Sequence, residues 1–146
     1  MLSPIPSTGR AIHVEVTTPE VRGEGSKRYV DYTVKVQTTL PIFELSESIV
    51  HRRYSQFEWL QKELERSSAK MLVPPIPDKA WQRQLPFFGK KDDQFQEEFI
   101  EERRRGLEEF INKVAEHPLA QNERALHVFL FDAEIDLSRY IPGKVK

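Results

Sequence analysis

Alternating apolar and polar residues predict β-strands in the first third of the chain. Apolar residues at every second position within 12–17 are typical of a strand with one buried face. A glycine-containing turn at 23–25 precedes the clearest alternation, over residues 30–37, and a third extended segment covers about 47–54. Three such strands joined by short links predict an antiparallel meander.

A helix is expected directly after the third strand. Phe57, Leu60 and Leu64 follow at spacings of three and four residues, which places them on one helix face. Ser55 is a favoured N-cap residue, and Glu58 three residues later would complete a capping box.

The second half of the chain predicts a long helix over about 95–116 and a last helix over 121–131, separated by Pro118. Apolar residues of the long helix fall within an arc of about 160°. They are Phe95, Phe99, Ile100, Leu107, Phe110, Ile111 and Val114. Arg103 lies near the middle of this arc, where a charge is costly unless it is paired. Either an internal acid or a ligand is therefore expected to meet it.

Two segments between the helices have no helical or strand periodicity. Residues 73–79 hold three prolines within four positions, which favours an extended conformation. Pro74 and Pro77 have the P-x-x-P spacing of an SH3-type ligand. The alternative is a stiff strap that fixes the position of Lys79.

The other segment, residues 81–91, combines an apolar tip with basic flanks. The tip is Leu85, Pro86, Phe87 and Phe88, and the flanks are Arg83, Lys90 and Lys91. This combination suits a loop that enters an anionic membrane surface. Packing of the phenylalanines into the core is the alternative.

Composition narrows the class of protein. With 146 residues, 38% hydrophobic and 31% charged, the chain predicts one soluble domain. A net charge of −1 argues against a nucleic-acid binder that needs a basic face. The absence of cysteine fits a reducing compartment, and we find no signal peptide and no membrane-spanning run. Residues 1–10 and 133–146 are expected to be tails.

Chemistry concentrates where the third strand meets its helix. Arg52, Arg53 and Tyr54 directly precede the expected helix N-terminus. Guanidinium groups suit phosphate oxygens, and a helix N-terminus adds free N–H groups and positive potential. The stretch is therefore a candidate anion pocket. The alternative is a strand end whose arginines are only solvated.

Catalysis is not expected. The four histidines are scattered, and neither G-x-S-x-G nor a Walker loop is present. Glu101 and Glu102 are adjacent, so on a helix they cannot face each other. The sequence also predicts no metal and no cofactor.

The order of these features resembles the PX (phox-homology) domain over about residues 11–132. The resemblance is carried by Arg53-Tyr54-Ser55-Gln56-Phe57, by the proline segment before Lys79, and by Arg103 four residues before Leu107. Three further segments look like the short PX-only sorting nexins of the sorting nexin-3 type. They are Phe99–Arg103, Phe110–Val114 and Pro118–Arg124. The resemblance implies an α+β fold, with a three-stranded antiparallel sheet packed against three or more helices and a proline strap.

The resemblance also implies a ligand, phosphatidylinositol 3-phosphate in endosomal membranes. Arg53 would hold the 3-phosphate with Ser55 nearby, Tyr54 would pack on the inositol ring, and Lys79 would meet the 1-phosphate. Arg103 would bind the 4- and 5-hydroxyls.

Residues 85–88 would form the membrane-insertion loop. A cytoplasmic monomer, peripheral on early endosomes, would act with a retromer-type coat and transmembrane cargo tails. A protein-interaction module that uses the strap or the sheet is the alternative function. Gln56 replaces the usual aspartate of the family, and the segment before the first strand is short for docking retromer.

Overall fold

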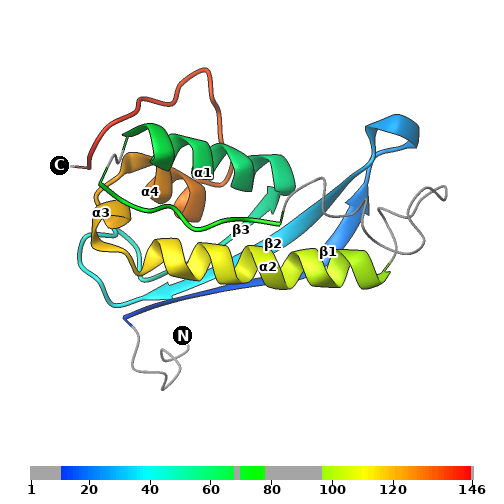
Figure 1. The fold of residues 1–146 in the computed structure, drawn as a ribbon, viewed down its shortest axis with the longest axis horizontal. Coiled ribbons are helices and arrows are strands. Elements are labelled where there is room, and N and C mark those ends of the chain that lie inside the picture. Colours follow the sequence, from blue (N-terminus) through cyan, green and yellow to red (C-terminus); the bar gives the residue numbers. More distant parts are fainter. Residues whose placement is uncertain (1–10, 68–69, 78–96, 146) are drawn as a thin grey trace.

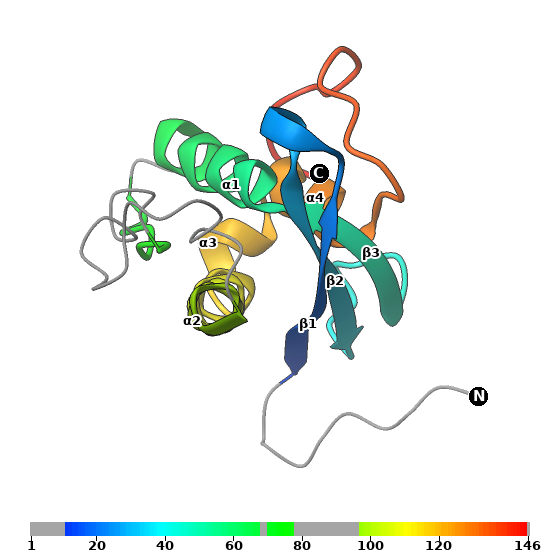
Figure 2. The same cartoon turned by 90° about the vertical axis from the view of Figure 1, so that its right-hand side faces the viewer.

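The computed structural model describes residues 11–67, 70–77 and 97–145, and within them a three-stranded sheet lies against a layer of helices (Figures 1 and 2). The strands are β1 (Ile12–Arg22), β2 (Tyr29–Thr38) and β3 (Glu47–Arg53). They are antiparallel in the order β1-β2-β3. The helices are α1 (Tyr54–Ser67), α2 (Glu97–Ala115), α3 (Pro118–Gln121) and α4 (Arg124–Phe131). The α+β fold predicted from the sequence is confirmed.

The sheet buries one face, as the alternation predicts. Ile12, Val14 and Val16 of β1 are buried, and so are the alternating residues of β2 opposite them. β1 continues to Arg22, beyond the predicted segment, because its last residues form a hairpin that projects from the body (Figure 1). Residues 17–22 of β1 are all half-buried or exposed, so this part of the strand carries no alternation of buried and exposed residues.

The start of α1 differs from the prediction. The helix begins at Tyr54, so Ser55 lies inside the first turn and not at the N-cap. Gln56 Oε1 accepts a hydrogen bond from the backbone N–H of Arg53 at 2.9 Å. Because β3 leads into α1 without a loop, Arg53 occupies the capping position and Gln56, three residues on, caps it. The predicted Ser55–Glu58 capping box is therefore wrong.

The proline segment is a strap between α1 and α2 (Figure 1). Gln61 Nε2 of α1 donates to the carbonyl of Pro74 at 3.1 Å, and the Tyr54 hydroxyl donates to the carbonyl of Pro77. On the other side, a Cβ placed on Gly106 of α2 would lie 2.4 Å from Cγ of Pro77, so only glycine lets the two approach. Pro74 and Pro77 are both half-buried by this packing, which favours the strap over an SH3-type ligand.

The last predicted helix, over 121–131, is found as α4 from Arg124, and the short helix α3 before it was not predicted. Pro118 ends α2 and also occupies the first turn of α3, where its missing N–H costs nothing. The ring of His117 accepts a hydrogen bond from the Leu119 N–H at 3.1 Å and caps this turn. The core side of α2 follows the predicted arc, with Phe99, Leu107, Phe110, Ile111 and Val114 buried. Phe95 lies outside the described residues.

Residues 133–145 run back over the helical layer. The Arg124 guanidinium donates to the carbonyls of Ile141, Pro142 and Lys144 at 3.0–3.4 Å. Tyr140 packs edge-on against Trp59 of α1, with ring centroids 5.1 Å apart. These contacts join the segment that follows α4 to α1.

Candidate functional site

The two arginines at the end of β3 point to opposite faces of the sheet. Strand alternation directs Arg52 inward, where it is 1% exposed. Its guanidinium donates to five carbonyls, of His51, Val128, Phe129, Asp132 and Ala133. Burial lowers its pKa to about 10, although the charge of Asp132 opposes the change. Arg52 thus holds the C-terminal end of α4 and is not available to a ligand.

Arg53 lies on the outer, exposed side of the same strand. Its guanidinium carbon stands 3.9 Å from the ring centroid of Tyr29, on the first residue of β2. No carboxylate of the described residues forms an ion pair with it. The Arg53 charge is therefore supported on one face and open to an anion.

Arg103, in the second turn of α2, is held between two aromatic rings. Its guanidinium carbon lies 4.1 Å from the ring centroid of Tyr54 and 4.7 Å from that of Phe99. Its Nε is buried without a hydrogen-bond partner in the part of the chain that the structure describes. Burial lowers the pKa of Arg103, and the nearby Tyr32, Tyr54 and Glu58 only partly oppose this. Of the two expected partners of Arg103, an internal acid or a ligand, the first is not found: no acid of the described residues forms an ion pair with it.

Tyr54 connects these parts. Its ring is 8% exposed and lies under the Arg103 guanidinium, while its hydroxyl donates to the Pro77 carbonyl. One tyrosine therefore joins the end of β3, the strap and α2. The N-terminal ends of α1 and α2 and the end of the strap lie at the same end of the molecule (Figure 1).

The structure thus places Arg103 against Tyr54, while Arg53, the preceding residue, packs on Tyr29 and Ser55 is exposed in the first turn of α1. Lys79 and the loop residues Leu85, Pro86, Phe87 and Phe88 lie outside the described residues. Tyr29 and Phe99, which support the two arginines, were not predicted as site residues. Tyr29 and Arg53 lie on different strands, so no sequence spacing reveals their contact. Phe99 lies four residues before Arg103 on α2, a spacing from which their contact could have been predicted.

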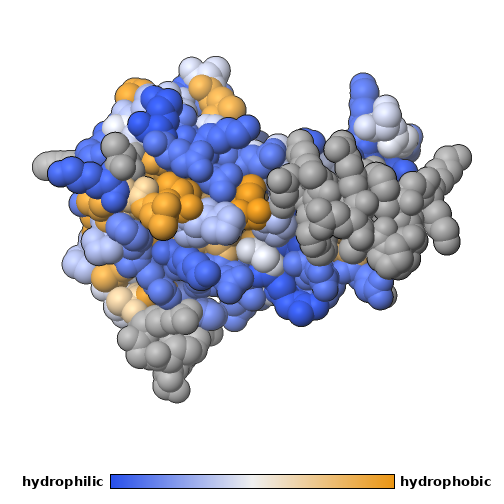
Figure 3. Space-filling view, viewed as in Figure 1, coloured by the Kyte–Doolittle hydropathy of each residue, from blue (hydrophilic) through white to orange (hydrophobic). Residues whose placement is uncertain are grey.

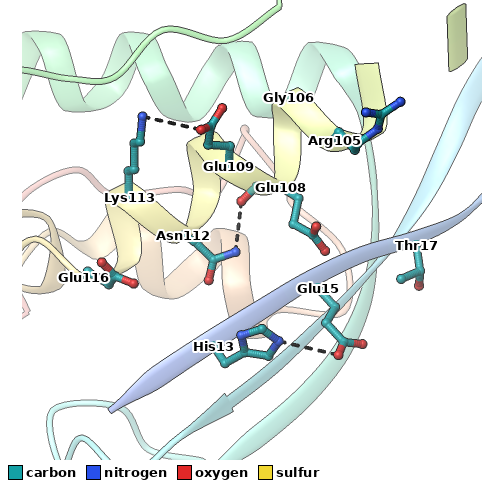
Figure 4. A pocket seen from close by; sticks show the side chains of 10 residues that line it. All are labelled: His13, Glu15, Thr17, Arg105, Gly106, Glu108, Glu109, Asn112, Lys113 and Glu116. Atoms are coloured by element: carbon teal, nitrogen blue, oxygen red, sulfur yellow. Dashed lines mark hydrogen bonds and ion pairs between the residues drawn. The ribbon is translucent and has the colours of Figure 1, made fainter. Parts of the chain in front are cut away.

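A separate open groove of about 840 Å³ runs between β1 and α2 (Figure 4). At its base the Asn112 amide both accepts from the Val14 N–H and donates to the Val14 carbonyl, at 2.9 and 2.7 Å. Glu108 accepts from the Val16 N–H, and Arg104 donates to the Val16 carbonyl. The helix side chains thus pair the outer edge of β1 in place of another strand, and none of the predicted site residues lines the groove.

In the part of the chain that the structure describes, no helix is long and apolar enough to cross a membrane. No group of three or more acidic, histidine or cysteine side chains there is arranged to hold a metal ion.

Comparison with known proteins assigns the family. Residues 40–132 match the PX domain. Human sorting nexin-3 is 57% identical over 135 residues, which cover 92% of this chain and 82% of that protein. Human sorting nexin-12 is 56% identical over the same shares, and sorting nexin-3 of Yarrowia lipolytica is 37% identical over 89% of this chain and 80% of its own length. The X-ray structure of a designed CISK-PX domain matches with a TM-score of 0.61 and 33% identity, covering 80% of this chain and 96% of that chain.

The chain therefore belongs to the PX-domain family. Within it, the chain is a sorting nexin of the sorting nexin-3 type. Sorting nexins with this domain are non-enzymatic, lipid-binding adaptors, which confirms the prediction that the chain is not an enzyme.

Proposed function

We propose that this chain is an endosomal sorting adaptor that recognises phosphatidylinositol 3-phosphate through Arg53, Tyr54 and Arg103. The observation that carries the proposal is the state of Arg103. A guanidinium stacked between two rings, with a buried Nε that lacks an acceptor among the described residues, is suited to polar groups brought by a ligand.

The two arginines have different roles in this proposal. Arg53 is exposed and free of described acids, so its fork can bind the 3-phosphate with two hydrogen bonds. Arg103 is partly desolvated, which suits neutral acceptors, and it binds the 4- and 5-hydroxyls of the inositol. A phosphate at either position would be too large for a guanidinium already in contact, which gives selectivity for the 3-phosphate.

The start of α1 adds to the pocket. The first N–H groups of a helix have no partner within the helix, and they face anions with favourable potential. Ser55, exposed in this turn, supplies a hydroxyl at the same place. Tyr54 supports Arg103 and the strap and, as the family resemblance implies, packs against the inositol ring. Lys79 meets the 1-phosphate by the family pattern.

Membrane attachment uses two weak signals in this proposal. The headgroup pocket selects the lipid, and the loop residues Leu85, Pro86, Phe87 and Phe88 enter the bilayer, so that their free energies partly add. The adaptor is then peripheral on early endosomes, where it acts with a retromer-type coat on transmembrane cargo. Serine at both Phe87 and Phe88 should weaken binding to vesicles but not to a soluble headgroup.

Vesicle co-sedimentation tests the pocket. Phosphatidylcholine vesicles with phosphatidylinositol 3-phosphate should bind the chain, and vesicles with an equal charge of phosphatidylserine should not. Arg53→Ala should weaken binding about tenfold to a hundredfold, since a charge-assisted contact is lost. Arg66→Ala is the matched control, because this arginine is exposed on α1 and its ion pair among the described residues is with Glu63, at 2.6 Å. Equal binding of wild type and Arg53→Ala, or of both vesicle types, would contradict the proposal and favour a protein-interaction module.

A further inference from the structure

The outer face of the sheet places an acid directly beside Arg53. In the register of β2 and β3, Asp31 is the residue opposite Arg53. On its other side Asp31 is opposite Glu20 of β1. Opposite charges at facing positions of neighbouring strands normally attract each other. Asp31 is therefore the natural competitor of a phosphate for the Arg53 guanidinium.

Asp31 is instead engaged by other groups. Arg22 Nε of β1 donates to its carboxylate at 3.2 Å, and His51 Nδ1 lies 3.9 Å from the same oxygen. The Asp31 side chain is only 14% exposed in this arrangement. Arg22 also binds Glu20 at 2.6 Å, so one guanidinium neutralises both acids of this row. The nearest acid is thereby kept from Arg53.

Tyr29 completes the arrangement. It is opposite Arg22 on β1, and the guanidinium carbon of Arg53 lies over its ring, 3.9 Å from the centroid. A ring on one face leaves the N–H groups at the edge of the guanidinium free, and these are the groups that grip a phosphate.

We infer that Tyr29 and Arg22 are positioning residues for the phosphate-binding arginine. The Tyr29 ring supports the Arg53 guanidinium, and Arg22 binds the Asp31 carboxylate so that Asp31 does not pair with Arg53. The inference rests on the proposed binding of a 3-phosphoinositide by Arg53. It predicts that substitution of Tyr29 or of Arg22 lowers lipid affinity although neither side chain contacts the lipid.

Tyr29 is tested with two substitutions. Tyr29→Leu removes the ring face and should weaken binding about twofold to fivefold, the range of an exposed cation–π contact. Tyr29→Phe keeps a ring face and should restore binding. Titration with soluble inositol 1,3-bisphosphate must show the same difference, because a residue that acts only by entering the bilayer would not affect a soluble headgroup. Equal binding of the leucine and phenylalanine variants would overturn the positioning role of the Tyr29 ring.

Arg22 is tested by rescue. Arg22→Ala should weaken binding of the same headgroup about threefold, because the released Asp31 attracts Arg53. Adding Asp31→Asn should restore binding, since the competitor is then neutral. Arg22→Ala with Glu20→Gln has the same net charge but leaves Asp31 free, so it should stay weak. Equal rescue by the two double variants would mean that only overall charge matters, and would overturn the positioning role of Arg22.

Arg53→Ala in the same titration distinguishes failure of the positioning inference from failure of the proposed function. If Arg53→Ala loses binding while the Tyr29 and Arg22 variants bind like wild type, the positioning inference fails and the proposed function stands. If Arg53→Ala also binds like wild type, both fail. Thermal melting of every variant checks that the fold is retained.

Discussion

Neighbouring arginines in this protein are expected to respond to the same substitution in opposite ways. Arg52→Met keeps most of the buried side-chain volume but removes every donor of the guanidinium. Arg53→Met does the same on the exposed face of β3. The first change should destabilise the fold, and the second should weaken lipid binding about tenfold to a hundredfold.

The magnitude for Arg52 follows from its contacts. Five carbonyls lose their donor, and each hydrogen bond to a charged group contributes about 1.5 kcal/mol, roughly 7.5 kcal/mol together. Burial of the charge is unfavourable, and the pKa of about 10 corresponds to roughly 3 kcal/mol that the substitution recovers. The free energy of unfolding should therefore fall by about 4 kcal/mol, and the melting temperature by on the order of 10 °C. Arg53→Met should change the free energy of unfolding by less than about 0.5 kcal/mol.

Urea unfolding and vesicle co-sedimentation on both variants decide the matter. Arg52→Met should bind vesicles normally at a temperature well below its melting point, because its guanidinium faces α4 and not the pocket. A stability loss below about 1 kcal/mol for Arg52→Met would refute the reasoning. Equal losses for the two variants would also refute it, since strand alternation would then not separate their roles.

Three other substitutions test the remaining contacts. Arg103→Leu should leave thermal stability unchanged or slightly higher, because a buried Nε that lacks a described partner is removed, while vesicle binding falls about tenfold; an easily unfolded variant would contradict this. Gly106→Ala should lower the free energy of unfolding in urea by about 1–2 kcal/mol despite the better helix propensity of alanine, because the new Cβ would lie 2.4 Å from Cγ of Pro77; a more stable variant would show that the strap moves aside at little cost. Tyr32 has a buried hydroxyl without a described partner and a pKa raised to about 12 by burial. The phenol ionises near pH 10 in the unfolded chain, so wild type should lose stability between about pH 10 and 12, and Tyr32→Phe should lose less. Urea melts of both proteins at pH 7 and pH 11 measure this, and equal losses of stability in the two would contradict it.

The elements that were predicted well are those with one buried face. β2 and α2 follow the expected segments closely, because burial on one side imposes a period of two or of 3.6 on the sequence. The projecting end of β1 and the short helix α3 were missed, because neither carries enough buried residues to leave a pattern. The N-cap of α1 was misplaced by two residues, because Gln56 caps the helix at Arg53 and Ser55 lies inside its first turn.

The same distinction applies to the site. Arg103 could be singled out because a charge within an apolar arc is visible in the sequence. Arg52 and Arg53 are adjacent and chemically identical in the sequence, and only the orientation of β3 makes one structural and the other exposed. The contact of Arg53 with Tyr29 joins two strands, so it depends on their register.

Local periodicity, proline geometry and motif order were enough to predict the three strands, the main helices, the strap and the family resemblance. The tertiary structure was needed to show which arginine is buried, that Gly106 admits the strap, and that the Tyr54 ring of α1 packs on Arg103 of α2. The physical reason is that burial and stacking are properties of pairs of segments far apart in the chain. Their energies depend on distances of 3–5 Å between atoms, and the order of residues along one strand or helix does not fix those distances.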